Sequence, residues 1–255
     1  MDAKPKITPG WIAQAKARGE KVAALTAYDY PTARLLDEAG VPVILVGDSL
    51  GMVVLGFPDT TQVTLQDIRH HLVAVARAKP RALVVGDLPY HTYQTPQDAL
   101  ANARVLVDAG ADAVKLEGGM AVIPEIVAIR EAGIAVMAHI GMLPQSVKEE
   151  GGYKIKGKSE PERERLLADA AAVEKAGAFA IVLELVQPDL AREITAVAGI
   201  PTIGIGSGSH CGGQIMVTHD LVGAFPWFRP KFAVAKADVA SVIRGAAEAF
   251  VREVG

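Results

Sequence analysis

Residues 111–119 read Ala-Asp-Ala-Val-Lys-Leu-Glu-Gly-Gly and directly follow a helix-like run that ends in Gly110. The segment has the length of a β-strand, in which alternate side chains point to opposite faces. Its valine and leucine therefore share one apolar face, whereas Lys115 and Glu117 share the other face with an alanine. Charged side chains on an inward face are costly to bury unless they are paired, solvated or bound to a ligand. The segment alone allows either a structural ion pair or a functional site, so the other strands must decide.

The same arrangement, an Ala-Gly pair followed by an apolar run, recurs along the chain. The glycines of these pairs are Gly40, Gly110, Gly133, Gly177 and Gly199. Each stands where a helix would end, and glycine tolerates the left-handed conformation that follows a helix. Each apolar run is typical of a buried parallel strand. The predicted strands after these pairs are 41–48, 111–117, 134–140, 178–185 and 200–205.

Three further segments complete the strand prediction. Apolar runs at 22–27 and 82–87 fit the scheme without the Ala-Gly pair, and we place the eighth strand at 214–218, with 231–235 as the second choice. Helical patterns such as 96–108 and 161–175 lie between the strands. Alternating strands and helices in this number and length predict an α/β protein with a (β/α)₈ barrel, and an open doubly wound sheet is the alternative. No linker interrupts the pattern, so we expect a single domain over residues 1–255.

The composition favours a soluble globular protein. The chain has 255 residues, 26 basic and 29 acidic side chains and a net charge of −3. No basic stripe indicates a nucleic-acid partner, and no apolar run reaches the roughly 18 residues that a membrane helix needs. The start of the chain lacks the apolar centre of a signal peptide. Cys211 is the only cysteine, which excludes an internal disulfide. We therefore expect a cytoplasmic protein without a nucleic-acid or membrane partner.

Polar residues stand at the ends of six successive predicted strands. They are Asp29, Asp48 with Ser49, Asp87, Lys115 with Glu117, His139 and Glu184. In barrel enzymes the carboxyl ends of the strands surround one active site. Taken singly, Asp29 could be a turn or helix cap and His139 a core histidine. Taken together, the six strand ends favour a functional cluster over scattered ion pairs.

The residue types in this cluster limit its chemistry. Asp48, Asp87 and Glu117 offer hard oxygen ligands of the kind that Mg²⁺ prefers. A bound Mg²⁺ can chelate a small 2-oxo acid and stabilise the enolate that forms from it. Lys115 could hold the carboxylate or the enolate oxygen of that acid. Glu184 stands between leucines and is the candidate general base for a proton next to the carbonyl. The residues by themselves do not identify the electrophile.

Several stretches are similar to the ketopantoate hydroxymethyltransferase family, in the family's order and over nearly the whole chain. They are Leu-Thr-Ala-Tyr-Asp at 25–29, Val-Gly-Asp-Ser-Leu-Gly-Met at 46–52, Gly-Asp-Leu-Pro at 86–89, Val-Lys-Leu-Glu-Gly-Gly at 114–119, Pro-Gln-Ser at 144–146 with Gly-Gly-Tyr at 151–153, and Ile-Gly-Ile-Gly at 203–206 with Gly-Gln at 213–214 and His-Asp at 219–220. The chain departs from the family pattern at Gly212, where Asp is common, and at Thr61-Gln62, where Leu-Pro is common.

The resemblance implies a (β/α)₈ barrel that assembles as a homodecamer and acts in pantothenate biosynthesis. It implies transfer of a one-carbon unit from the co-substrate 5,10-methylenetetrahydrofolate to 3-methyl-2-oxobutanoate, which gives 2-dehydropantoate. By the same resemblance, Asp48, Asp87 and Glu117 bind Mg²⁺ and Glu184 accepts the proton. The predicted substrate-binding residues are Asp48, Ser49, Asp87, Lys115 and His139, and Lys115 is grouped with Glu184 as catalytic.

Other functions stay open at this point. A lyase or mutase that acts on a small 2-oxo acid would also use a bound Mg²⁺ to stabilise an enolate. The lone Cys211 in a glycine-rich stretch disfavours the cysteine loop of such a lyase. A barrel that binds a ligand without catalysis is a second alternative, which the complete set of charged residues disfavours. Residues 148–158 follow the fifth strand, and we predict a lid there, with Lys154, Lys156 and Lys158 near the glutamate tail of folate.

Overall fold

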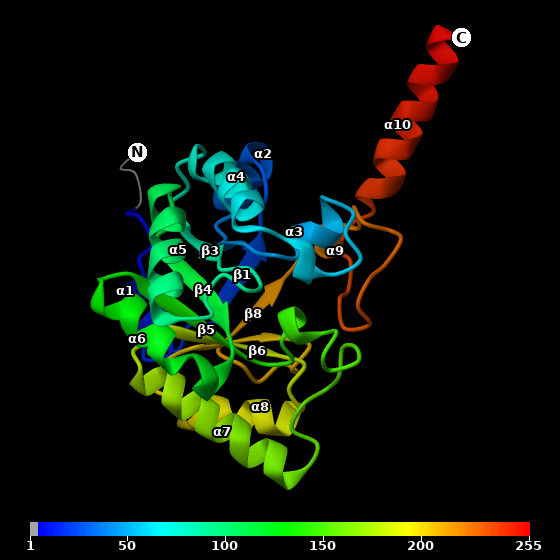
Figure 1. Ribbon diagram of the computed structural model, residues 1–255. Helices are drawn as coiled ribbons and strands as arrows, with labels where there is room; N and C mark the ends of the chain where they lie inside the picture. The colour runs from blue at the N-terminus through cyan, green and yellow to red at the C-terminus, as the bar shows by residue number, and fades with distance from the viewer. Residues whose placement is uncertain (1–4) are drawn as a thin grey trace. The chain divides into compact units, whose positions relative to one another are not determined.

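The computed structural model describes residues 5–255, and these residues form two compact units, one that extends to Ile215 and one from Met216 to Gly255. In the first unit parallel strands close into a barrel in sequence order, with helices around it (Figure 1). The strands are β1 (Val22–Thr26), β2 (Val43–Val46), β3 (Leu83–Asp87), β4 (Ala113–Glu117), β5 (Ala135–Gly141), β6 (Ala180–Glu184), β7 (Thr202–Ile205) and β8 (Gly213–Met216). The closed barrel confirms the predicted fold class and excludes the open doubly wound sheet. The preferred eighth strand is confirmed, whereas residues 231–235 contain no strand.

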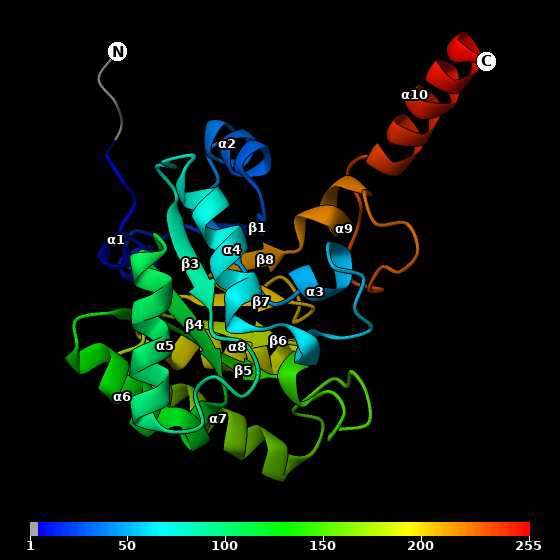
Figure 2. The ribbon, with the colours of Figure 1, turned by 45° about the horizontal axis from the view of Figure 1, so that its top comes forward.

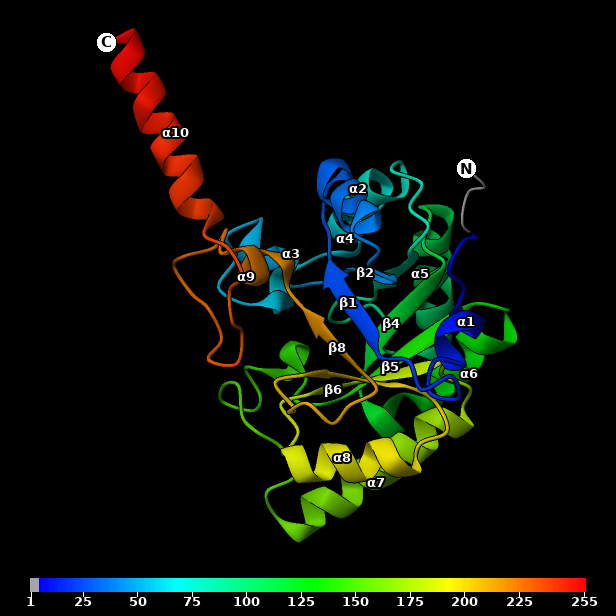
Figure 3. The same cartoon turned by 180° about the vertical axis from the view of Figure 1, so that it is seen from behind.

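Helices and short 3₁₀ turns fill the connections between the strands. In the first unit they are α1 (Pro9–Ala13), α2 (Tyr30–Glu38), α3 (Leu50–Val53), η1 (Thr60–Gln62), α4 (Leu65–Ala76), α5 (Pro96–Asp108), η2 (Gly119–Val122), α6 (Ile123–Glu131), η3 (Pro144–Ser146), α7 (Glu160–Lys175) and α8 (Pro188–Val197). Helices α4 and α5 lie side by side (Figure 2), as do α7 and α8 (Figure 3). None of the helices within residues 5–255 has the length and apolarity needed to cross a membrane.

The second unit, Met216–Gly255, contains α9 (Thr218–Val222) and α10 (Val239–Val254). Backbone hydrogen bonds from Lys236 to Leu221 (2.7 Å) and from Ala240 to Gly223 (3.1 Å) tie the start of α10 and its preceding loop to α9. Asp238 caps α10 by accepting a hydrogen bond from the Ser241 N–H at 3.2 Å. The sequence does not reveal this division, and a single domain over residues 1–255 stays a prediction.

Local sequence signals explain where the helices begin and end. Asp29 is the N-cap of α2, and its carboxylate accepts a hydrogen bond from the Thr32 N–H at 2.7 Å, which matches the alternative interpretation of Asp29 as a cap. The glycines Gly40, Gly110, Gly133 and Gly177 follow helices with positive φ angles, as predicted. The expectation of a left-handed residue is wrong for Gly199. A Cβ there would lie 2.5 Å from Glu174 Oε1, the atom that accepts the Gly199 N–H at 2.9 Å.

The barrel strands separate two apolar cores. Inward-facing residues such as Val43, Val85 and Ala113 pack together inside the barrel. Outward-facing residues such as Val114 and Leu116 pack against the surrounding helices. The alternation predicted for the fourth strand is therefore confirmed, and it leaves Lys115 and Glu117 on the inner face.

The strand register brings polar residues of neighbouring strands side by side. Asp87 pairs with Lys115, Glu117 with His139, and Gly141 with Glu184. These pairs lie at the carboxyl ends of β3 to β6, where a parallel barrel gathers its functional groups. Residues spread over about a hundred positions of sequence thus reach one end of the barrel.

Gly141 offers a test of how closely β5 and β6 approach beside Glu184. Its φ is +100°, and a Cβ there would lie 2.3 Å from the Glu184 carbonyl oxygen. Gly133 is the matched control, because its φ is +82° and a Cβ there would meet no atom within 4 Å. Gly133→Ala should cost about 1–3 kcal/mol for backbone strain. Gly141→Ala should cost roughly 1–3 kcal/mol more from overpacking, measured by urea unfolding. Equal losses in the two variants would show that the strand end relaxes.

Candidate active site

The predicted site residues converge at the carboxyl end of the barrel. Asp48 follows β2, Asp87 ends β3, Lys115 and Glu117 belong to β4, His139 to β5, and Glu184 ends β6. The first five are buried, with no more than 5% of each residue exposed, and the Glu184 side chain is 12% exposed. Ionisable groups at such depth are rare unless they are paired or serve a function. We call these six residues the charged cluster.

Lys115 is the only lysine or arginine in the charged cluster. Its Nζ lies 2.7 Å from Asp87 Oδ1 and 3.7 Å from Glu117 Oε1. Burial works to lower the pKa of Lys115, but the carboxylates of Asp87, Glu117 and Asp48 outweigh it and hold the pKa above its usual value. Lys115 is therefore a permanent positive charge at neutral pH. The other oxygen of Asp87 accepts a hydrogen bond from the Asp48 N–H at 3.2 Å.

His139 stands between two carboxylates. Its Nδ1 is 3.3 Å from Glu117 Oε1, and its Nε2 is 3.5 Å from Glu184 Oε2. Neither ring nitrogen, nor Glu117 Oε1, makes a hydrogen bond among the described residues. The interpretation of His139 as a core histidine with its hydrogen bonds satisfied is therefore wrong. Both ring nitrogens are buried between the carboxylates of Glu117 and Glu184.

The carboxylates of the charged cluster differ in their pKa values. Burial, together with Asp87 and Glu117, raises the pKa of Asp48 well above its usual range. Burial and Glu117 likewise raise the pKa of Glu184 well above its usual range. Burial also raises the pKa of Asp87, against the opposing charge of Lys115. For Glu117, burial is outweighed by His139 and Lys115, and the pKa falls below its usual value.

The donor set suits a divalent cation. Asp48, Asp87, Glu117 and Glu184 bring up to four negative charges, against the single positive charge of Lys115, so a bound cation would relieve their repulsion. Within residues 5–255 no three His, Cys, Asp or Glu side chains already stand in metal-ligand geometry. Mg²⁺ is commonly held by one or two carboxylates, with water and substrate oxygens completing its shell. The oxygen donors present here fit that pattern.

Gln145 and Tyr93 belong to the site, although the sequence reasoning gave them no role. The Gln145 Nε2 donates to Asp48 Oδ2 at 2.9 Å and to the Leu88 carbonyl at 3.0 Å. Its backbone N–H donates to Glu117 Oε2 at 3.2 Å. The Tyr93 hydroxyl donates to Gln145 Oε1 at 2.5 Å. Gln145 thus fixes one oxygen of each of two carboxylates, and its place in the loop that follows the fifth strand is the sequence signal for it.

Ser49 lies beside the charged cluster but pairs elsewhere. Its Oγ is 2.8 Å from the Tyr28 hydroxyl, and the Tyr28 carbonyl is 2.6 Å from His71 Nδ1. His71 of α4 therefore supports Tyr28, which in turn positions Ser49. The neighbouring His70 lies on the exposed side of the same helix.

The segment 148–158 lies beside the end of β6, where the Lys156 N–H donates to the Leu185 carbonyl at 2.7 Å. Burial, followed by the charges of Glu184 and Asp48, raises the pKa of the Tyr153 hydroxyl, while part of the ring stays exposed. Lys156 forms an ion pair with Glu150, and Lys154 donates to the Glu150 carbonyl. These two lysines are engaged within the segment. The proposed contact of Lys154, Lys156 and Lys158 with a folate tail stays a prediction.

The two departures from the family pattern lie in connecting turns. Gly212 precedes β8, where its carbonyl accepts the Val22 N–H at 3.0 Å and helps to close the barrel. Thr61 lies in η1, and its N–H donates to Asp59 Oδ1 at 2.9 Å. Lys148 donates to the Thr61 hydroxyl at 2.6 Å. The threonine at this position therefore contacts the start of the segment 148–158.

The model of the ketopantoate hydroxymethyltransferase family matches residues 6–255. The chain belongs to this family. A 3-methyl-2-oxobutanoate hydroxymethyltransferase of Moorella thermoacetica is 52% identical over 256 residues, which cover all of this chain and 95% of the relative. One of Pyrobaculum neutrophilum is 56% identical over 241 residues, 94% of this chain and 92% of the relative. The family membership makes the protein a one-carbon transferase and confirms the resemblance read from the sequence.

Solved structures of other enzymes share the fold at low sequence identity. Phosphonopyruvate hydrolase in complex with oxalate and Mg²⁺ superposes with a TM-score of 0.67 at 15% identity, over 97% of this chain and 88% of the other. A 2,3-dimethylmalate lyase superposes with a TM-score of 0.63 at 19% identity, over 97% and 88%. At this identity the likeness shows the barrel fold alone. It does not bear on which reaction this chain catalyses.

Proposed function

We propose that the charged cluster carries out the family's reaction with Mg²⁺ and 5,10-methylenetetrahydrofolate. The oxo acid 3-methyl-2-oxobutanoate loses its C3 proton, C3 bonds to the one-carbon unit, and water supplies the hydroxyl group of 2-dehydropantoate while tetrahydrofolate leaves. The observation that carries the proposal is the full-length family match of a chain whose predicted site residues meet at one barrel end.

The proposed ligands of Mg²⁺ are Asp48, Asp87 and Glu117. A bound Mg²⁺ would polarise the 2-oxo group and stabilise the charge that develops on its oxygen. Asp48 and Asp87 lie on adjacent strand ends, and the hydrogen bond from the Asp48 N–H to Asp87 holds the two side by side. Gln145 orients the Asp48 and Glu117 carboxylates, which keeps the remaining oxygens directed at the site.

Binding of the oxo acid falls to Lys115, His139, Ser49 and the two aspartates. Lys115 keeps its positive charge at neutral pH and can bind the substrate carboxylate or the enolate oxygen through charge-assisted hydrogen bonds. The ring nitrogens of His139, which lack hydrogen bonds in the described chain, can accept or donate one to the substrate. Asp48, Asp87 and Ser49 line the same barrel end.

Proton removal falls to Glu184. Its carboxylate lies at the end of β6 in a mostly buried position, and burial, followed by the charge of Glu117, raises its pKa, which makes the carboxylate a stronger base. Backbone hydrogen bonds join Lys156 to Leu185 (2.7 Å) and to Gln187 (2.9 Å), directly after Glu184, so the segment 148–158 is placed to exclude water from the base.

We further propose that the enzyme works in the cytoplasm as a homodecamer, as the family resemblance implies. Light scattering after size-exclusion chromatography would measure its mass.

Product formation tests the function directly. The purified enzyme should convert 3-methyl-2-oxobutanoate to 2-dehydropantoate only when both Mg²⁺ and 5,10-methylenetetrahydrofolate are present, and chelation by EDTA should stop turnover. Product formation without folate would contradict the transferase proposal. Cleavage of the oxo acid instead of its extension would favour a lyase.

A further inference from the structure

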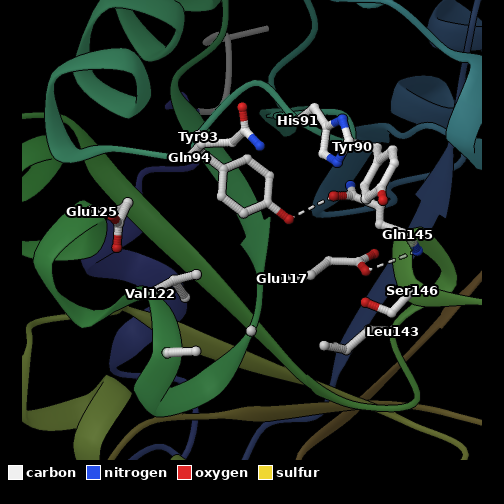
Figure 4. Close-up of a pocket in the computed structure, with 12 residues that line it drawn as sticks. Tyr90, His91, Tyr93, Gln94, Glu117, Val122, Glu125, Leu143, Gln145 and Ser146 are labelled. Atoms are coloured by element: carbon white, nitrogen blue, oxygen red, sulfur yellow. Dashed lines mark hydrogen bonds between the residues drawn. The ribbon is translucent and has the colours of Figure 1, made fainter. Parts of the chain in front are cut away.

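A cavity of about 350 Å³ lies beside the charged cluster. It is lined by the loop between β3 and α5, the end of β4 with η2, the start of α6 and the turn η3, and Figure 4 shows its side chains. Ligand pockets in proteins begin at roughly 300 Å³, so the cavity can hold a small ligand or part of a larger one. Glu117 lines the cavity and also belongs to the charged cluster. A molecule in the cavity would therefore touch the site at which the oxo acid reacts.

Glu125 lines this cavity and is a buried charged group that the proposed reaction does not use. It lies in the first turn of α6 and is only 7% exposed. Its Oε2 is fully buried and has no hydrogen-bond partner, and no lysine, arginine or histidine forms an ion pair with it in residues 5–255. Leaving a buried carboxylate without donors is costly. The helix N-terminus favours the negative charge but does not replace the missing donors.

The walls of the cavity are flat and largely apolar. The rings of Tyr90 and His91 stack with centroids 3.7 Å apart and an interplanar angle of 25°. The ring of Tyr93 stands between them and Glu125 in Figure 4, and Val122 and Leu143 form the opposite wall. Aromatic and aliphatic walls favour a planar ring, and two carboxylates oppose an anion. The cavity therefore suits a flat heterocycle that carries N–H donors on its edge.

We propose that this cavity binds the pterin ring of the folate co-substrate, with Glu125 as its recognition residue. The 2-amino-4-oxo edge of a pterin carries an amino group and a ring N–H side by side, and one carboxylate can accept both hydrogen bonds. The reactive one-carbon end of the folate would then face Glu117 and the oxo acid. The proposal rests on the proposed function, because it assigns a subsite for that reaction's donor.

The test compares Glu125→Gln with the matched control Glu131→Gln. Glu131 is the last residue of the same helix and is exposed, so both variants remove one negative charge from α6. The KM for 5,10-methylenetetrahydrofolate should rise about 10- to 100-fold in Glu125→Gln, as expected when hydrogen bonds to a charged group are lost. Inhibition by 6-methyltetrahydropterin, which lacks the tail, should weaken by the same factor. The oxo acid KM should stay unchanged, and Glu131→Gln should match the wild type in all three measurements.

Thermal stability separates this role from a structural one. Because Glu125 Oε2 has no hydrogen bond to lose, Glu125→Gln should melt at the wild-type temperature or above it. An unchanged folate KM, or a lowered melting temperature with unchanged inhibition by the pterin, would overturn the proposal. Weakened inhibition by p-aminobenzoylglutamate alone would place the tail in the cavity and overturn it equally. Failure of the proposed function looks different, because the wild-type enzyme would then form no 2-dehydropantoate.

Discussion

Glu184→Gln should slow the exchange of the C3 proton of 3-methyl-2-oxobutanoate with solvent by about 10²- to 10⁴-fold, the usual contribution of a positioned general base. The exchange is followed by loss of deuterium from labelled oxo acid in the presence of Mg²⁺ and without folate. This design isolates proton removal from the transfer of the one-carbon unit. Binding of the oxo acid should persist, because Lys115 and the aspartates are unchanged.

The pH dependence of exchange should follow the raised pKa of Glu184. A base acts in its deprotonated form, so the wild-type rate should rise with pH through that pKa and then level off. Burial and Glu117 raise the pKa in the folded protein, so the native state holds this proton to higher pH than the unfolded chain does. The group therefore lowers the free energy of unfolding as pH rises above its unfolded pKa of about 4.3. Glu184→Gln removes this penalty and should be at least as stable as the wild type at pH 7.

Two results would contradict the assignment of Glu184. Exchange at the wild-type rate in Glu184→Gln would place the base elsewhere, and His139, 3.5 Å away, would be the next candidate. A large loss of stability would instead indicate that Glu184 serves the fold through a contact with His139. Glu193→Gln is the control, since Glu193 is an exposed carboxylate on α8 that pairs with Arg163.

The barrel was predictable because each of its signals is local. Gly40, Gly110 and Gly133 each mark the end of a helix, and each is followed by an apolar run of strand length. One strand-helix unit of the barrel can therefore be recognised from each such stretch of sequence. The eighth unit was harder to recognise because β8 is short and contains Gly213 and an exposed glutamine, so its apolar pattern is weak. Gly199 shows the limit of the rule. Its N–H donates to Glu174 Oε1 at 2.9 Å, a contact between separate segments that no local pattern reveals.

The charged residues of the site were predictable for a related reason. In a parallel barrel, strand ends meet whatever their distance in sequence, so Asp87, Lys115 and Glu184 could be grouped before their positions were known. Gln145 was not grouped with them, because an uncharged amide in a loop is ordinary until its partners are seen. The same holds for Glu125, which looks like a helix-start glutamate in sequence. Its significance comes from burial, from the lack of a partner and from the cavity beside it.

Lys115→Met should lower the free energy of unfolding by about 3–5 kcal/mol, the range found when one partner of a buried ion pair is removed. The substitution keeps most of the side-chain volume but leaves the buried carboxylate of Asp87, 2.7 Å from Nζ in the wild type, without its cation. Lys148→Met is the matched control. Its ion pair with Asp59 is 3.3 Å long but the lysine is 62% exposed, so the loss there should not exceed about 1 kcal/mol.

A double-mutant cycle with Asp87→Asn separates the ion pair from the rest of the lysine side chain. Removing both charges should restore part of the stability, because neither partner is then left buried alone. Urea unfolding of the wild type, both single variants and the double variant gives the coupling energy. Additive losses would mean that Lys115 and Asp87 do not depend on each other, and would contradict the pairing that the structure shows.

Binding of the oxo acid decides whether Lys115 also serves the reaction. Its Nζ has three donors, of which the Asp87 contact uses one, and Glu117 lies farther away at 3.7 Å. If a remaining donor binds the substrate carboxylate, Lys115→Met should weaken binding of 3-methyl-2-oxobutanoate about 10- to 100-fold under conditions where the variant is folded. Calorimetric titration measures this affinity, with Lys148→Met expected to match the wild type. If Lys115→Met loses stability but binds the oxo acid as tightly as the wild type, Lys115 serves only as a structural ion pair. The sequence alone could not exclude that role.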